Sequence, residues 1–132
     1  MAAEQAEILR IRANSFLKNA SRLLLEEEYD LAAFNIEQFC QLLLKYKLLQ
    51  KTVTYPRVHS PVRLLRELAA ASRSSKVITQ FIESEIMLLT KVEDAYIVSR
   101  YLPRRYERRE VEVLLEFGER VQETCRKNLN NT

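Results

Sequence analysis

Apolar residues recur every three to five positions along most of the chain, which is the spacing of amphipathic helices. The first stripe predicts a helix over about residues 4–27. After a short acidic turn, a second stripe predicts a helix that ends near Gln50, for which Asp30 is a plausible N-cap. The chain is therefore expected to begin with a pair of long helices.

Three more helices are predicted after a loop that contains Pro56. Ser60 followed by Pro61 is a good N-cap and first helical residue, so a short helix should span residues 61–71. Further apolar stripes predict a fourth helix over residues 77–99 and a fifth over residues 111–129.

The composition agrees with a helical chain. Of the 132 residues 47% are hydrophobic and 30% are charged, and one Gly and three Pro are too few for a fold built from β-hairpins. Since short connections make helices antiparallel neighbours, we expect the all-α class, as an up-and-down bundle of four long helices plus one short helix. Residues 1–132 are expected to form a single domain.

The sequence also excludes several kinds of chemistry. A glycine-rich phosphate loop needs several glycines, and the chain has one. A helical zinc or di-iron site needs more than one histidine, and His59 is the only histidine in the sequence. Cys40 and Cys125 lack a CxxC spacing and are expected to be buried thiols. Every apolar run is interrupted by charge before it is long enough to cross a bilayer. We therefore expect a cytoplasmic protein with no metal, no cofactor and no membrane contact.

Positive charge is concentrated in two stretches, although the net charge is only +3. Residues 38–82 carry 8 basic and 1 acidic side chains, and residues 100–109 carry 5 and 1. In an alternating bundle the connections within these stretches lie at one end, opposite the acidic turn, which predicts a single basic pole. Its candidate members are Lys47, Lys51, Arg57, His59, Arg63, Arg100, Arg104, Arg105, Arg108 and Arg109, interleaved with Tyr55, Tyr101 and Tyr106. Such a mixture suits phosphate contact and base stacking.

Plainer interpretations stay open for the same residues. The arginines can be solvated side chains at helix ends, where the helix dipole favours them, or they can hold carboxylates. His59 can be a general base, a phosphate ligand, or a loop histidine that hydrogen-bonds the backbone. Glu93 and Asp94 do not share a helix face, and surface solvation explains them.

Three segments resemble, in this order, the HEPN family of small helical domains: FLKNASRLLLEEEYDLAAFNIEQFCQLLLKYKLL, YPRVHSPVRLLREL and AYIVSRYLPRRYERREV. The resemblance implies a helical bundle that forms a homodimer and is often paired with a small nucleotidyltransferase in a toxin–antitoxin system. Many HEPN domains are metal-independent ribonucleases. They use an Arg, four to six intervening residues and a His, paired across the dimer.

Within this resemblance Arg100 matches the arginine of the motif, but Tyr106 stands where the histidine could fall. His59 cannot replace that histidine within the motif, because no Arg lies four to six residues before it. Tyrosine, with an unperturbed pKa near ~10, is a poor general base at neutral pH. We therefore expect retained binding with lost or weak cleavage.

Three functions follow as hypotheses. In the first, the chain binds a nucleotide or RNA and acts with a nucleotidyltransferase partner. Arg100 then contacts phosphate, Tyr101 and Tyr106 stack or hydrogen-bond, and Arg104 and Arg105 attract phosphate. Arg57 is a further member of this binding site. In the second, it is a ribonuclease toxin in which Arg100 acts with Tyr106 or His59. In the third, the basic residues dock an acidic protein partner.

Overall fold

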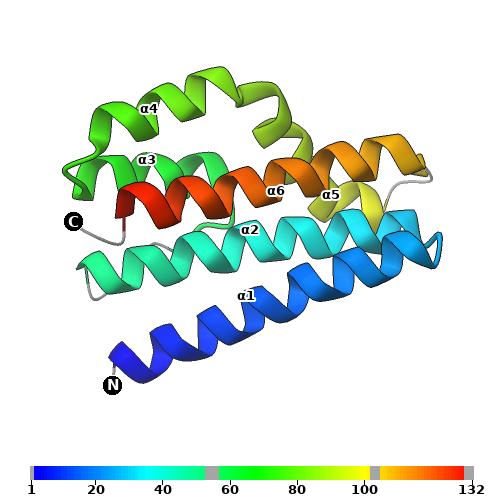
Figure 1. Cartoon of the computed structure of the whole chain (residues 1–132), viewed down its shortest axis with the longest axis horizontal. Helices are drawn as coiled ribbons and strands as arrows, with labels where there is room; N and C mark the ends of the chain where they lie inside the picture. The colour runs from blue at the N-terminus through cyan, green and yellow to red at the C-terminus, as the bar shows by residue number, and fades with distance from the viewer. Residues whose placement is uncertain (1, 53–56, 102–104, 130–132) are drawn as a thin grey trace.

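The computed structural model describes residues 2–52, 57–101 and 105–129, and only the backbone of residues 2, 99, 100 and 129. Within these ranges the chain is helical and has no strand (Figure 1). The all-α prediction is therefore confirmed. The helices are α1 (Ala2–Leu25), α2 (Tyr29–Thr52), α3 (Pro61–Ala71), α4 (Ser75–Ser84), α5 (Ile86–Tyr101) and α6 (Arg108–Leu129).

The α1–α2 turn is closed by backbone hydrogen bonds rather than by a side-chain cap. The N–H of Glu28 donates to the carbonyl of Leu23 (2.9 Å), and the N–H of Glu27 donates to that of Leu24 (3.1 Å). Glu27 has a φ of 62°, the left-handed conformation that ends many helices. Since α2 already begins at Tyr29, the prediction that Asp30 is its N-cap is wrong.

The short helix α3 has the predicted bounds and the predicted cap. The Ser60 hydroxyl accepts a hydrogen bond from the N–H of Arg63 (3.2 Å), and Pro61 is the first helical residue. Its direction differs from the alternation we expected. His59 lies beside the middle of α2, 2.8 Å from Gln41, so the chain returns along α2 before α3 begins, and α3 then runs in the same direction as α2 (Figure 1).

The predicted fourth helix is two helices, α4 and α5, which meet at an angle (Figure 1). Glu85 separates them with φ −111° and ψ 13°, outside the helical range. Backbone hydrogen bonds continue on both sides of the break: the N–H of Glu85 donates to the carbonyl of Phe81, and the N–H of Leu89 donates to the carbonyl of Glu85. The side chain of Arg120 in α6 donates to the Glu85 carboxylate (2.8 Å). The break was not predicted because the apolar period passes through it.

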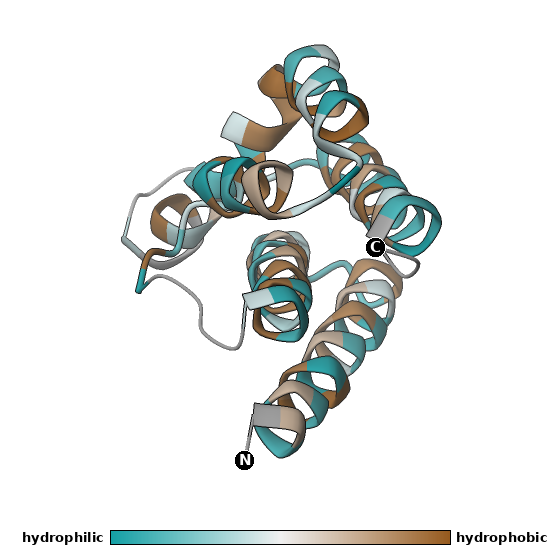
Figure 2. Cartoon of the chain, turned by 90° about the vertical axis from the view of Figure 1, so that its left-hand side faces the viewer, coloured by the Kyte–Doolittle hydropathy of each residue, from teal (hydrophilic) through white to brown (hydrophobic). Residues whose placement is uncertain are grey.

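Helix α2 is the centre of the molecule. It packs against α1, α3, α5 and α6, and the end-on view shows the other helices arranged around it (Figure 2). Of its 24 residues 14 are buried, and five of these carry polar or charged side chains: Asn35, Glu37, Gln41, Lys45 and Lys47. A helix that is covered on nearly all sides has little surface left for its polar residues, so these must find partners inside the protein.

The large phenylalanines belong to the core of the chain itself. Phe39 is fully buried, and Phe16 and Phe81 are partly buried against the same core. Phe34 is partly buried, with its ring centroid 6.3 Å from that of Tyr96. These side chains therefore give no independent support for a dimer. Apolar side chains that stay exposed include Ile8 and Ile11 on α1.

Candidate functional site

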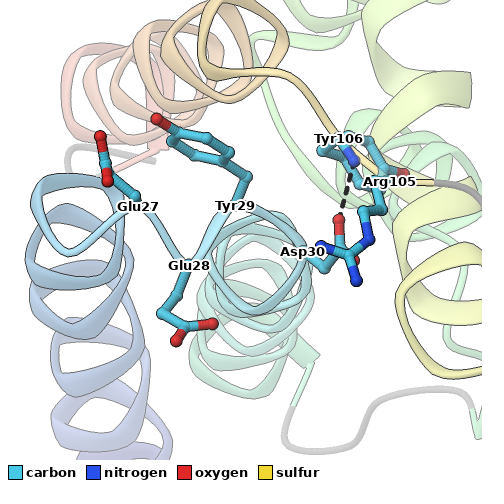
Figure 3. Close-up of a pocket in the computed structure, with 6 residues that line it drawn as sticks. All are labelled: Glu27, Glu28, Tyr29, Asp30, Arg105 and Tyr106. Carbon is cyan, nitrogen blue, oxygen red and sulfur yellow. Dashed lines mark hydrogen bonds between the residues drawn. The ribbon is translucent and has the colours of Figure 1, made fainter.

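The segment that follows α5 lies against the acidic turn between α1 and α2 (Figure 3). The N–H of Tyr106 donates to Asp30 Oδ1 (2.7 Å), and Arg108 lies 3.5 Å from a Glu27 oxygen. The Arg108 guanidinium also lies over the ring of Tyr29, 5.6 Å from its centroid. A small cavity of about 90 Å³ remains between the two segments.

The prediction of a single basic pole is wrong. It placed the acidic turn at the opposite end from residues 100–109, whereas Arg105 and Tyr106 line one cavity together with that turn. Because α3 runs parallel to α2, the alternation on which the prediction depended does not hold. Lys47, one of the proposed members, is buried on α2, 5.1 Å above the ring of Tyr46.

The predicted contact residues differ in their exposure. Tyr101 ends α5 with 66% of its surface exposed, and Arg57 and Arg105 are also exposed. Tyr106 is only 3% exposed, so its ring is covered by the chain and is not free to stack on a base. Arg100 lies in the last turn of α5, where the backbone alone is described, and Arg104 and Tyr55 lie outside the described residues.

A second group of polar residues joins the loop before α3 to the middle of α2. Gln41 Nε2 donates to Glu37 Oε2 (2.9 Å), and Gln41 Oε1 accepts from Lys45 Nζ (3.1 Å) and faces His59 Nδ1 (2.8 Å). Gln38 donates to the other oxygen of Glu37 (2.7 Å). In the described part of the chain His59 thus bonds side chains, whereas the plainest interpretation of it expected a bond to the backbone.

Two contacts act on His59 Nδ1. The Gln41 amide nitrogen is directed at Glu37, so its carbonyl oxygen, which can only accept, faces Nδ1 at 2.8 Å. Lys45 Nζ, which can only donate, lies 3.3 Å from the same nitrogen and favours the opposite tautomer. The shorter contact, with Gln41, makes Nδ1 the donor and leaves Nε2 with a lone pair in the neutral ring. No hydrogen bond to Nε2 is found among the residues whose placement is described.

Tyr96 and Glu93 of α5 complete this second group. The rings of His59 and Tyr96 are nearly parallel, at 7°, with centroids 6.4 Å apart. One oxygen of Glu93 accepts from the Ser60 hydroxyl and from the N–H of Val62 (3.0 Å), so this carboxylate holds the start of α3. The prediction that Glu93 is simply solvated is wrong.

These residues surround an open pocket of about 190 Å³, lined by Glu37, His59, Ser60, Glu93, Tyr96 and Ile97. Glu37 is 1% exposed, and its burial raises its pKa to about 7, even though hydrogen bonds from Gln38 and Gln41 act in the opposite direction. Burial also lowers the pKa of Lys45. The pocket is therefore bordered by a carboxylate that lacks the water it would have at a surface.

Sequence reasoning named His59 but missed Glu37, Gln41 and Lys45. The signal was present, because these three residues are spaced by four and so share one face of a helix. We interpreted α2 through its apolar stripe alone. Polar residues at helical spacing in a helix that is otherwise apolar indicate an internal network.

The remaining predictions about chemistry concern metals and thiols. Among the residues described, no group of three or more His, Cys, Asp and Glu side chains is arranged to hold a metal ion. Cys40 and Cys125 are buried and unpaired, as expected, and burial raises the pKa of Cys125 to about 12. No helix in the described part of the chain is long and apolar enough to span a membrane.

Comparison with known proteins identifies the class of this helical protein. The model of the HEPN domain family matches residues 6–128, which is nearly the whole chain, and the chain belongs to this family. No curated protein and no solved structure matches it significantly.

Proposed function

We propose that this HEPN protein binds a nucleotide or RNA at the end of α5 and the start of α6, as the cytoplasmic partner of a small nucleotidyltransferase in a toxin–antitoxin-like pair. The observation that supports this is the exposed ring of Tyr101, followed within eight residues by the exposed arginines Arg105, Arg108 and Arg109. Exposed aromatics beside arginines bind nucleic acid by stacking and by phosphate contact.

The ion pairs of these arginines are weak enough to be exchanged for phosphate. Arg108 is 3.5 Å from Glu27, and Arg109 is 3.5 Å from Glu112 and 3.8 Å from Glu116. All of these side chains are at least one third exposed. Pairs of this kind contribute only about 0–1 kcal/mol. A phosphate group can therefore take over the guanidinium groups at little cost.

The test is a titration of single-stranded RNA at two salt concentrations. We expect salt-sensitive binding, and the double substitution Arg104→Ala and Arg105→Ala should reduce affinity by about tenfold, since two phosphate contacts are lost. Arg12→Ala with Lys18→Ala removes the same charge from exposed positions of α1 and serves as the control. Equal affinity of the two double variants would reject this site.

A second candidate function is RNA cleavage, and one observation favours it. His59 stacks on Tyr96, and position 100 follows Tyr96 by one turn of α5. His59, with a lone pair on Nε2, and Arg100 thus belong to the same region of one chain. Cleavage of labelled RNA that is lost in both Arg100→Ala and His59→Ala would support it. Intact RNA under all conditions would leave the binding function alone.

The partner and the oligomeric state are separate parts of the proposal. We propose a homodimer, and light scattering of the purified protein tests it directly. Co-expression with a nucleotidyltransferase that is encoded next to it tests the second partner. Affinity for an acidic protein without any affinity for RNA or nucleotides would instead favour the docking role.

A further inference from the structure

We propose that the pocket between α2, α5 and the loop before α3 binds a guanine base through its N1–H and N2–H₂ edge. This inference rests on the proposed function, because it assigns the base-recognising part of a nucleotide site. The pocket is formed by Glu37, His59, Ser60, Glu93, Tyr96 and Ile97.

The size and walls of the pocket suit a flat ring. Its volume of about 190 Å³ is several times the ~30 Å³ that one water occupies, so it is too large to be the site of a single ion or water. Two aromatic side chains, His59 and Tyr96, line it with parallel rings. Ile97 is 52% exposed, which leaves the pocket open to solvent on that side. Aromatic walls favour a planar ligand that can stack on them.

Above pH 7, where Glu37 is ionised, the polar groups of the pocket are mainly hydrogen-bond acceptors. Each Glu37 oxygen accepts one hydrogen bond and keeps a further lone pair. Since Glu37 is 1% exposed, a base reaches these oxygens only when the side chains that cover them move aside. In Glu93, Oε1 receives the bonds from Ser60 and Val62, and no bond to Oε2 is found within the described part of the chain. The Ser60 hydroxyl already donates to Glu93. A complementary ligand must therefore bring donors.

Guanine is the base that offers most donors on one edge. Its N1–H and N2–H₂ groups are adjacent and match the two oxygens of a carboxylate, whereas adenine and cytosine present one amino group beside acceptors. A buried carboxylate that faces an acceptor would lose its hydrogen bonds, so the pocket should reject adenine. A guanidinium group presents similar donors and is the competing ligand to test.

The position of the pocket relative to the arginines fits a nucleotide. Tyr96 lines the pocket, and Tyr101 at the end of the same helix lies five residues on, a rise of about 7.5 Å along the axis. A nucleotide with its base in the pocket can thus place its phosphate near the end of α5, and the exposed arginines Arg105, Arg108 and Arg109 follow this end in the chain.

The experiment measures the affinity of the full chain for GMP, IMP and AMP by calorimetry at pH 8, where Glu37 is ionised, with L-arginine as a fourth probe. We expect GMP to bind at least about tenfold more tightly than AMP, with IMP, which lacks the 2-amino group, in between. Glu37→Gln should abolish this preference, because its amide presents a donor to the base. Glu119→Gln, the same change at an exposed position of α6, should keep it.

A second variant covers the case in which Glu37→Gln disturbs the fold. Ile97→Trp changes an exposed side chain at the mouth of the pocket and should weaken GMP binding about tenfold or more without lowering thermal stability. Equal affinities for GMP and AMP, or a preference that survives Glu37→Gln, would refute the base site. Arginine binding without GMP binding would do the same.

The results also separate this inference from the proposed function. If RNA binds in a salt-sensitive manner but GMP and AMP bind equally, only the guanine pocket is wrong. If neither RNA nor any nucleotide binds at low salt, both are wrong.

Discussion

Glu27 occupies a backbone conformation that favours glycine. Its φ of 62° is the only positive φ of a non-glycine residue in the described ranges, and a side chain in the left-handed region costs roughly 1 kcal/mol. Glu27→Gly should therefore stabilise the protein by up to about 1 kcal/mol. The exposed pair with Arg108 that is lost contributes little. Urea denaturation measures the change; Glu28→Gly, which relieves no such strain, should bring no gain.

Gly118 is the opposite case, because nothing in the structure requires a glycine there. A Cβ at this position would lie 3.6 Å from Ile36 Cγ2 and from two carbons of Phe39, which is ordinary van der Waals contact. Gly118→Ala should thus stabilise α6 by up to about 1 kcal/mol. Gly118→Leu should destabilise the protein by about 1–3 kcal/mol, since the larger side chain meets Ile36 and Phe39. A loss of stability with Ala would show that the close approach of the helices needs the glycine.

At the scale of elements, the sequence predicts what local chemistry determines. The bounds of α3 are right because Ser60 and Pro61 fix its start by a hydroxyl cap and a missing N–H. The break at Glu85 was missed because apolar periodicity is the same on both sides of it. The network on α2 was missed because Glu37 and Gln41 became internal only when other helices covered that face.

Burial of Glu37 in α2 makes the stability depend on pH. Its pKa is about 7 in the folded protein, against 4.5 when unfolded, so the folded chain holds this proton over the range between them. The contribution of Glu37 to the free energy of unfolding is fully present below pH 4.5. It is lost as the pH rises through about 7, which lowers the free energy of unfolding by up to roughly 3 kcal/mol. Glu37→Gln should remove this part of the decline. Urea titrations at pH 5 and pH 8 measure it, and equal declines in both proteins would contradict the shift.

At the scale of the whole molecule, the acidic turn and the basic segment after α5 lie at the same end of the bundle, although we expected them at opposite ends. The acidic turn before α2 and the segment with Arg105 and Tyr106 lie side by side (Figure 3), joined by the hydrogen bond from the Tyr106 N–H to Asp30. Sequence reasoning found both charged segments but not their contact. Their placement depends on the direction of α3, which the residues of a connection eight residues long do not determine. The family resemblance, by contrast, was carried by residues spread over most of the chain and is confirmed.

The contact between Asp30 and Tyr106 links stability to the proposed binding site. Asp30→Ala removes the acceptor of the Tyr106 N–H in a residue that is almost fully buried, which should cost about 1–3 kcal/mol. It also releases the segment that carries Arg105, so RNA affinity should fall although a negative charge has been removed. Glu28→Ala removes the same charge from the same cavity without this bond and should leave affinity equal or slightly higher. Thermal melts and RNA titrations of the two variants separate the effects. If affinity rises equally in both, charge alone matters, and the anchoring of the segment by Asp30 has no part in binding.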